Sequence, residues 1–185
     1  MADCIYRFVS EKASPVTLAV MKSYLKVTAT ADDKLIQSMI DAATKWGEKY
    51  TGRDFRAITW ELLLDGFTDR IELRRDPVDS IITVKHLVSA SLVTVDAPTY
   101  YLKKLTQSSE VLLNEDQEWP TDTDDREQAI EIRFVTTGYQ CQDSIIEAVE
   151  RHVAWWYRNR GDCCNESAKN SGVTIIYDQF RISRV

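Results

Sequence analysis

One change of period divides the chain and constrains its fold more than any other feature. Between residues 32 and 51, apolar side chains recur every three or four positions, which predicts one buried face of an α-helix. This stripe comprises Leu35, Ile36, Met39, Ile40, Ala43, Trp46, Gly47 and Tyr50. Thr30 or Asp32 is suited to cap the helix start, and Gly52 to end it in a left-handed conformation. From Arg53 onward the period changes to two, so β-strands are expected.

About seven short strands are predicted between residues 53 and 138 from their alternating apolar and polar residues. They are contained in "AITWELLLDGF", "RIELRRDPV", "SIITVKHLV", "SLVTV", "TYYLKKL", "EVLLN" and "AIEIRFVT". The dipeptide Asp65-Gly66 indicates a turn after which "RIELRRDPV" returns as a hairpin partner. Regular short strands with turns favour an antiparallel sandwich or a curled sheet.

Two further helices and one more strand flank this region. A short helix from Val16 to about Lys26 follows Ser14-Pro15, and residues 4–9 have the composition of a short strand. Residues 143–160 return to helical spacing, with an apolar stripe at Ile145, Ile146, Val149, Val153, Trp156 and Tyr157. We expect this late helix to pack on the helix at 32–51, because each stripe needs apolar cover.

The predicted fold class is therefore α+β, a small helical bundle with an inserted antiparallel β-sandwich-like subdomain. The expected parts are the N-terminal helices (1–52), the β subdomain (53–140), the late helix (141–161) and a C-terminal arm (162–185). Trp155 points away from the main stripe of the late helix, toward the same side as Ala148 and His152. An aromatic ring there is either exposed or in contact with something else.

The C-terminal arm combines a polar spacer with an apolar end. "DCCNESAKNSG" has little to bury, whereas "VTIIYDQFRISRV" brings back large apolar residues beside arginines, and we expect it to be one strand or an extended arm. Either it adds an edge strand to its own β subdomain, or it docks on a partner. The predicted partner-binding residues are Trp155, Ile175, Ile176, Tyr177, Phe180, Arg181 and Arg184.

Charge and hydropathy narrow the classes of partner. The net charge of −6 argues against broad, non-specific nucleic-acid binding, which needs clustered lysine and arginine. No segment approaches the roughly 18 apolar residues that a membrane-spanning helix needs, and the first residues lack the pattern of a signal peptide. We therefore expect no membrane association and reduced cysteines at Cys4, Cys141, Cys163 and Cys164.

The residues that could support catalysis or metal binding do not form a recognised motif. The chain has no phosphate-binding glycine loop, Gly-x-Ser-x-Gly or His-Glu-x-x-His sequence. An acidic loop carries Asp122, Asp124, Asp125 and Glu127 without the spacing of an EF-hand, and His86 and His152 are expected to be structural. Catalytic, cofactor and metal sites are predicted to be absent, so the chain is not expected to be an enzyme.

Four stretches together resemble the head–tail connector, or head-completion adaptor, proteins of long-tailed bacteriophages. They are "VTLAVMKSYLKV", "DDKLIQSMIDAATKWGEKYTGRDF", "RIELRRDPVDSIITVKHL", which is similar to the family's first β-hairpin, and "SIIEAVERHVAWWYRNRG". The pairing of Tyr-Thr-Gly-Arg after one helix with Trp-Tyr-Arg-Asn-Arg far downstream is the most specific part. The resemblance covers most of residues 16–161.

This resemblance implies a virion structural protein that forms a ring under the portal protein, extends the DNA channel and docks neck or tail proteins. Its implied partners are the portal, further copies of itself and a neck or tail-completion protein. The resemblance also implies that DNA passes through the ring without specific binding. The implied localisation is the virion, with assembly in the host cytoplasm.

Two other classes of function stay open on sequence alone. A β-sandwich binding module, or another phage tail or neck completion protein, could use Trp60, Tyr100, Tyr101 and Trp119 as a site, although core packing is commoner for aromatics. A metal-dependent enzyme would use the acidic loop or the cysteines.

Overall fold

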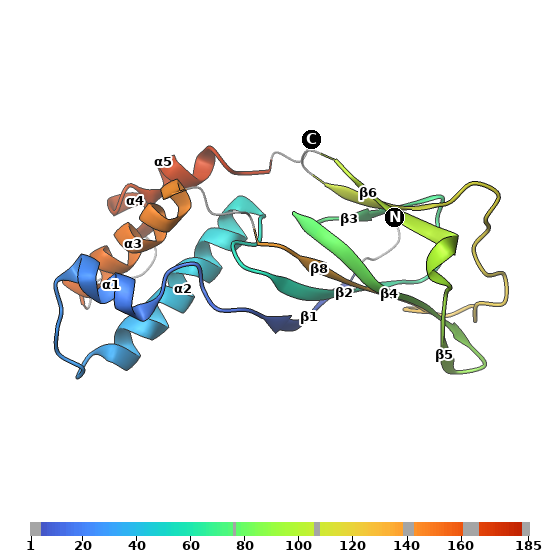
Figure 1. The fold of residues 1–185 in the computed structure, drawn as a ribbon, viewed down its shortest axis with the longest axis horizontal. Coiled ribbons are helices and arrows are strands. Elements are labelled where there is room, and N and C mark those ends of the chain that lie inside the picture. The colour runs from blue at the N-terminus through green and yellow to red at the C-terminus, as the bar shows by residue number, and fades with distance from the viewer. Residues whose placement is uncertain (1–4, 76, 106–107, 139–142, 161–166, 183–185) are drawn as a thin grey trace. The chain divides into compact units, whose positions relative to one another are not determined.

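The computed structural model describes residues 5–75, 77–105, 108–138, 143–160 and 167–182. It combines helices with antiparallel sheets, which confirms the predicted α+β class (Figure 1). The chain divides into two compact units. A β unit contains the chain up to Lys12 and from Ala57 to Gly138, and a helical unit contains Ala13–Arg56 and the chain from Tyr139. The N-terminal strand therefore groups with the β unit and not with the helices that follow it.

The β unit consists of two antiparallel sheets. One has five strands in the order β1-β2-β8-β4-β5, and the other has three in the order β3-β7-β6. The strands are β1 (Ile5–Glu11), β2 (Ile58–Leu64), β3 (Arg70–Leu73), β4 (Val78–Val88), β5 (Ser91–Thr94), β6 (Tyr100–Lys104), β7 (Ser109–Leu113) and β8 (Ile130–Thr136), with a 3₁₀ turn η1 at Ala97–Thr99. All seven strands predicted after Arg53 are present, and the suggested N-terminal strand is β1.

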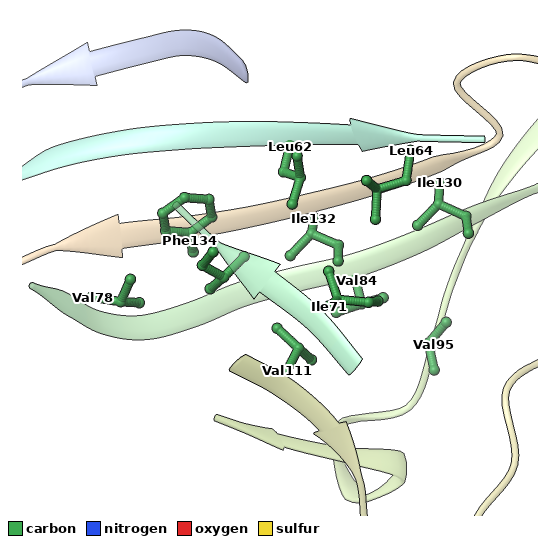
Figure 2. Packing of buried hydrophobic residues seen from close by; sticks show 11 residues of the cluster. Leu62, Leu64, Ile71, Val78, Val84, Val95, Val111, Ile130, Ile132 and Phe134 are labelled. Carbon is green, nitrogen blue, oxygen red and sulfur yellow. The ribbon is translucent and has the colours of Figure 1, made fainter. Parts of the chain in front are cut away.

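Side chains from both sheets meet in one aliphatic core (Figure 2). Ile130, Ile132 and Phe134 of β8 are completely buried, and Glu131 and Arg133 point to the opposite face, as the alternation predicts. Ile71 and Val111 approach them from the three-stranded sheet. Burial of this shared face holds the two sheets together.

The predicted hairpins around β3 are wrong. Strand β2 pairs with β1 and β8, whereas β3 pairs with β7 and β4 pairs with β5 and β8. The link from Asp65 to Asp69 carries the chain from one sheet to the other, so that Ile71 and Leu73 can cover the core from the second sheet. A turn signal specifies a reversal but not the strand that becomes the neighbour.

The outer face of the five-stranded sheet carries a row of alternating charges. Across neighbouring strands, Glu61 contacts Arg7 at 3.8 Å and Arg133 at 2.8 Å. Arg133 also lies 3.2 Å from Glu131, which is 4.0 Å from Lys85. The row keeps this face polar while the inner face is apolar, the usual arrangement of an antiparallel sheet with one buried side.

The helical unit contains α1 (Leu18–Leu25), α2 (Asp33–Thr51), α3 (Asp143–Arg158), α4 (Ser167–Asn170) and α5 (Val173–Asp178). The hydroxyl of Thr17 caps α1 by accepting from the Val20 N–H. Gly52 ends α2 with φ of 74°, as predicted, and its N–H donates to the Glu48 carbonyl. The lengths of α2 and α3 agree with the predicted apolar stripes.

Helices α2 and α3 pack through the predicted residues. Ile36, Ile40 and Ala43 of α2 form a completely buried cluster with Val149 and Val153 of α3. Met39, Ile146 and Trp156 complete this contact, and Val16 and Met21 cover it from the α1 region. Figure 1 shows α2 and α3 beside each other. The predicted contact between the two helices is confirmed.

Asp32 precedes α2 but does not cap it through its side chain. Instead, its carboxylate accepts from the Tyr157 hydroxyl at 2.6 Å and from the Arg160 guanidinium at 2.7 Å. These bonds, Tyr157 first, hold the pKa of Asp32 below its ordinary value. The capping residue expected from local sequence therefore joins the start of α2 to the end of α3.

The expectation of a strand or an extended arm at the C-terminus is wrong for the described residues, because 173–178 form α5. Val173, Ile176, Tyr177 and Phe180 follow helical spacing and pack with Phe55, Ile145 and Ala148. The Ile182 N–H donates to the Thr51 carbonyl at 2.9 Å, and Arg53 donates to the Phe180 carbonyl at 2.8 Å. The segment completes the interior of the helical unit and adds no strand to a sheet.

Candidate interaction surfaces

The predicted partner-binding residues of the C-terminal segment separate into an outer and an inner set. Ile175 is 71% exposed, and Arg181 is also exposed, with its guanidinium 5.5 Å from the Tyr50 ring. Arg184 lies outside the described residues. Among the described members of this segment, Ile175 and Arg181 are thus the ones with exposed side chains.

The inner set belongs to the core of the helical unit. Tyr177 is completely buried, Phe180 is buried and Ile176 is half-buried. Burial raises the pKa of the Tyr177 hydroxyl above its ordinary value, and the nearby Glu48 carboxylate raises it further. The Phe55 ring stacks on Tyr177 with 5.8 Å between the ring centres. These side chains are part of the core of the helical unit.

The second face of α3 is covered by the C-terminal segment. Ala148 packs in the α5 cluster, and the His152 Nε2 atom lies 3.3 Å from the Ser167 hydroxyl. Burial lowers the pKa of His152 to about 4, so the ring is neutral near pH 7. Trp155 is half-buried. The covering element is visible in the sequence as apolar residues at 173, 176, 177 and 180, although Val173 and Ile175–Ile176 also fit a strand.

His86 and the acidic loop, which were considered as catalytic or metal-binding candidates, have structural partners. His86 is buried, with its Nδ1 atom 3.2 Å from the Thr123 hydroxyl and 3.7 Å from an Asp122 carboxylate oxygen. The Asp124 carboxylate accepts from the N–H groups of Ser89 and Ala90, and these bonds, Ala90 first, lower its pKa. Part of the acidic loop therefore caps the β4–β5 turn.

The aromatic residues considered as a binding site mostly pack on the β core. The Trp119 ring stacks on Phe67 at 4.5 Å, and its N–H donates to the Thr68 carbonyl. The Arg75 guanidinium lies 3.9 Å from the centre of the Trp60 ring. Tyr100 also packs against the core, and Tyr101 is exposed.

Within the ranges that the structure describes, no group of three or more histidine, cysteine, aspartate and glutamate residues is placed to hold a metal ion. The four cysteines all lie outside the described residues. The described helices include none with the length and apolar character needed to cross a bilayer.

Exposed apolar side chains also gather on elements for which no partner contact was predicted from the sequence. On the two outer strands of the five-stranded sheet they are Ile5, Phe8, Val9, Leu92 and Val93. On α1 they are Val20 and Tyr24, one helical turn apart. Strand positions that are apolar on both faces, as at Phe8-Val9 and Leu92-Val93, are the sequence signal that could have revealed them.

The described residues form a small α+β protein in which His86, His152 and Asp124 have structural partners and exposed apolar residues lie on outer strands and helices. Residues 15–123 match the family model of phage gp6-like head–tail connector proteins. The chain belongs to this family, a structural class of bacteriophage protein. A comparison with curated protein sequences finds no significant match.

Solved structures from gene transfer agent particles have the same fold. A chain in the virion of the native particle has a TM-score of 0.76 at 20% identity, covering 98% of this chain and 97% of that one. A chain from the neck of the native particle, computed with C12 symmetry, has a TM-score of 0.75 at 19% identity with the same coverage. A chain from the neck of the empty particle, computed with C6 symmetry, has a TM-score of 0.75 at 18% identity, again covering 98% and 97%.

Proposed function

We propose that this chain is a head–tail adaptor that forms a ring under the portal protein, extends the DNA channel and offers a docking surface to a neck or tail-completion protein. The observation that carries the proposal is the family match over residues 15–123. The adaptor assembles in the host cytoplasm and remains in the virion. Its role is structural and needs no catalytic group.

The structural comparisons support a ring. Two of the similar chains come from particle necks computed with sixfold and twelvefold symmetry. A subunit in a closed ring presents two different lateral patches, because each contact joins unlike surfaces. It also needs surfaces for the proteins above and below. A chain with several separate exposed apolar regions meets this requirement.

The exposed residues of the helical unit are our candidates for contact with the portal or the next neck protein. Ile175 and Arg181 are exposed and Trp155 is half-buried, and Ile175 is the most exposed large apolar residue among those described. Ile176, Tyr177 and Phe180 act indirectly, by holding α5 in place. Burial of an aromatic or aliphatic anchor at the centre of an interface supplies much of its affinity.

DNA is expected to pass through the ring without specific binding. The chain has a net charge of −6, and the arginines of the outer β face are paired with Glu61 and Glu131. Few cations therefore remain there to displace counterions from phosphate. In a gel-shift assay at physiological salt, the free protein should bind duplex DNA weakly and without sequence preference.

The direct test mixes the full chain with the portal protein of the same genome and images the product. Rings on the portal support the proposal, and a chain that neither binds the portal nor forms rings contradicts it. The variant Ile175→Asp should weaken portal binding by about tenfold or more, because a charge replaces an apolar contact. Gln179→Asp, which also places a new carboxylate on an exposed position beside α5, serves as the matched control.

A further inference from the structure

The five-stranded sheet ends in β1 and β5, and no other strand within the described residues pairs with their outer sides. All four residues of β5 are exposed, as are all residues of β1 except Tyr6. An edge strand offers unpaired N–H and C=O groups that can pair with a strand of another chain. Both edges are therefore candidates for pairing with a strand of another chain.

Hydrogen bonding identifies which backbone groups of β5 are open. The Val95 N–H donates to the Val84 carbonyl at 2.9 Å. Backbone groups alternate in direction along an antiparallel strand, so Val93 also faces β4, whereas Leu92 and Thr94 face the open edge. On β1, the bond from the Lys12 N–H to the Ala57 carbonyl fixes the direction at one end of the strand. The bulge between Phe8 and Ser10 then shifts the alternation by one residue, so the backbone groups of Phe8 face outward.

Both of these edges carry exposed apolar side chains beside polar ones, Arg7 and Glu11 among them, whereas the exposed residues on the outer strands of the other sheet are mostly charged. Phe8 is 54% exposed and Leu92 is 49% exposed, with Ile5, Val9 and Val93 also exposed. The exposed residues of β3 and β6, the outer strands of the three-stranded sheet, include Arg70, Glu72, Lys103 and Lys104. Charges on an edge strand prevent pairing with other chains. Among the described residues, exposed large apolar side chains lie on both outer strands of the five-stranded sheet, whereas the three-stranded sheet has Tyr101 on β6.

Strand direction determines which edges can meet in a ring. Four antiparallel pairings separate β1 from β5, so the two strands run in the same direction. Neighbours in a ring differ by a rotation about one axis, and the outer strand of one copy therefore meets the opposite outer strand of the next. Two copies of β1 would instead pair by twofold symmetry and stop at a dimer.

We propose that β5 of one copy pairs in parallel with β1 of the next copy, so that the five-stranded sheet continues from subunit to subunit. The proposal rests on the ring proposed above and specifies its lateral contact. The occupant of each edge is a second copy of this chain, because the two open edges of one sheet provide the unlike patches that a ring requires.

The test blocks one edge without disturbing the sheet. Thr94→Pro removes an outward N–H that the contact with β4 does not use, and proline is tolerated at such edge positions. Lys104→Pro is the matched control. Because the Leu105 N–H donates to the Ser108 carbonyl, the Lys104 N–H also faces outward, on the edge of the other sheet. Melting temperatures verify that both variants fold.

A second variant blocks the other edge, and mixing tests the direction of pairing. Phe8→Lys places a charge on β1, so this variant retains an open β5, whereas Thr94→Pro retains an open β1. Each variant alone should need roughly tenfold more protein to form rings, with or without the portal protein. When the two variants are mixed, β5 of Phe8→Lys should pair with β1 of Thr94→Pro. The product should be a dimer with one copy of each variant and no larger assembly.

The outcomes distinguish this inference from the proposed function. Rings that form normally from Thr94→Pro or from Phe8→Lys overturn the strand pairing and leave the adaptor role intact. Equal loss of rings in Lys104→Pro also overturns it, because the effect is then not specific to one sheet. A wild-type chain that forms no ring, alone or with the portal protein, refutes the adaptor role and this inference together. Mass photometry and electron microscopy provide both readouts.

Discussion

The two units of this chain bury different chemistry. The hydrophobic cluster of the β unit consists of aliphatic side chains and Phe134. Its buried Glu61 and Glu131 pair with Arg133 on the outer face of a sheet, and its buried His86 contacts Thr123. The helical unit buries Glu48 with Arg56, the His152 ring and the Tyr177 hydroxyl. The β core can therefore be inferred from alternation alone, whereas the helical interior depends on polar groups that need particular partners.

The Glu48–Arg56 pair illustrates the difference. Glu48 accepts from the Arg56 guanidinium at 3.3 Å through each carboxylate oxygen and from the Phe55 N–H at 3.0 Å. Burial raises the pKa of Glu48 and the Arg56 charge partly opposes that rise. Loss of either partner would leave a buried charge uncompensated, which generally costs more than the intact pair contributes. The helical unit should accordingly be the more sensitive of the two to change.

The largest expected effect follows from deleting residues 173–185. The deletion removes Val173, Tyr177 and Phe180 from the core and uncovers Ile145 and Ala148 on α3. We expect the helical unit to lose on the order of 5 kcal/mol or more, since each large buried side chain contributes several kcal/mol. Hydrogen exchange measured by mass spectrometry should show faster exchange in α2 and α3.

The β strands are the internal control for this deletion, because their core contains none of the removed residues. A truncated chain with unchanged protection in α2 and α3 would show that α5 is not part of the folding unit. Such a result would restore the docking arm inferred from the sequence.

Ile40→Asp should be the next most severe change. Ile40 is completely buried between α2 and α3, so the variant buries an unpaired carboxylate. We expect a loss of about 4 kcal/mol in the free energy of unfolding. Leu35→Asp, on the exposed side of the same helix, should change stability by less than about 1 kcal/mol. Similar losses for both variants in urea titrations would contradict the observed packing.

Acid should weaken the helical unit through His152. Burial lowers the pKa of this ring to about 4, so the unfolded chain binds a proton more readily than the folded one. The stability associated with neutral His152 is fully present above pH 6.5 and is lost as the pH falls from 6.5 toward 4. A shift of this size corresponds to about 3 kcal/mol.

The measurement compares the wild type with His152→Leu, which cannot titrate at this position. Unfolding free energies across this pH range isolate the histidine, because Glu48 and other carboxylates titrate in both proteins. The stability difference between them should decline with falling pH. A difference that stays constant from pH 7 to pH 4 would show that the ring is accessible to protons in the folded state.

Gly47→Ala should have a smaller effect whose sign is informative. Alanine favours helices over glycine by about 1 kcal/mol. However, a Cβ atom at position 47 would lie 2.6 Å from the Phe55 ring and 2.9 Å from the Tyr177 ring. Overpacking of this kind costs about 1–3 kcal/mol, so we expect net destabilisation. A thermal melt that shows stabilisation would mean that the aromatic cluster can move aside.

The strands and the two long helices could be predicted from the sequence because their signals are local. Alternation along β2 and β8 and the stripe of α2 depend only on which side chains share a face. Strand pairing was not predictable in the same way. The Asp65-Gly66 turn indicated a hairpin, but burial of Ile71 and Leu73 placed β3 in the other sheet.

The interaction surfaces were also only partly predictable from local sequence. The sequence identified Ile175 and Arg181 as residues that a partner could contact, and both are exposed. It grouped Tyr177 and Phe180 with them, although these side chains fill the core. The exposure of a side chain depends on what packs against it. Helix α5 packs against α3, and the local sequence of α5 does not indicate this partner.

By itself, the sequence determined the α+β class, the periods of the long elements, the left-handed end of α2 at Gly52 and the resemblance to head–tail connectors. Each depends on residues close together in the chain or on their order. Only the tertiary structure decided that Asp32 binds Tyr157 and Arg160, that Ser167 of α4 contacts His152, and that exposed apolar residues lie on both outer strands of one sheet. These features join residues far apart in sequence, and the burial of distant surfaces selects them among many locally acceptable alternatives.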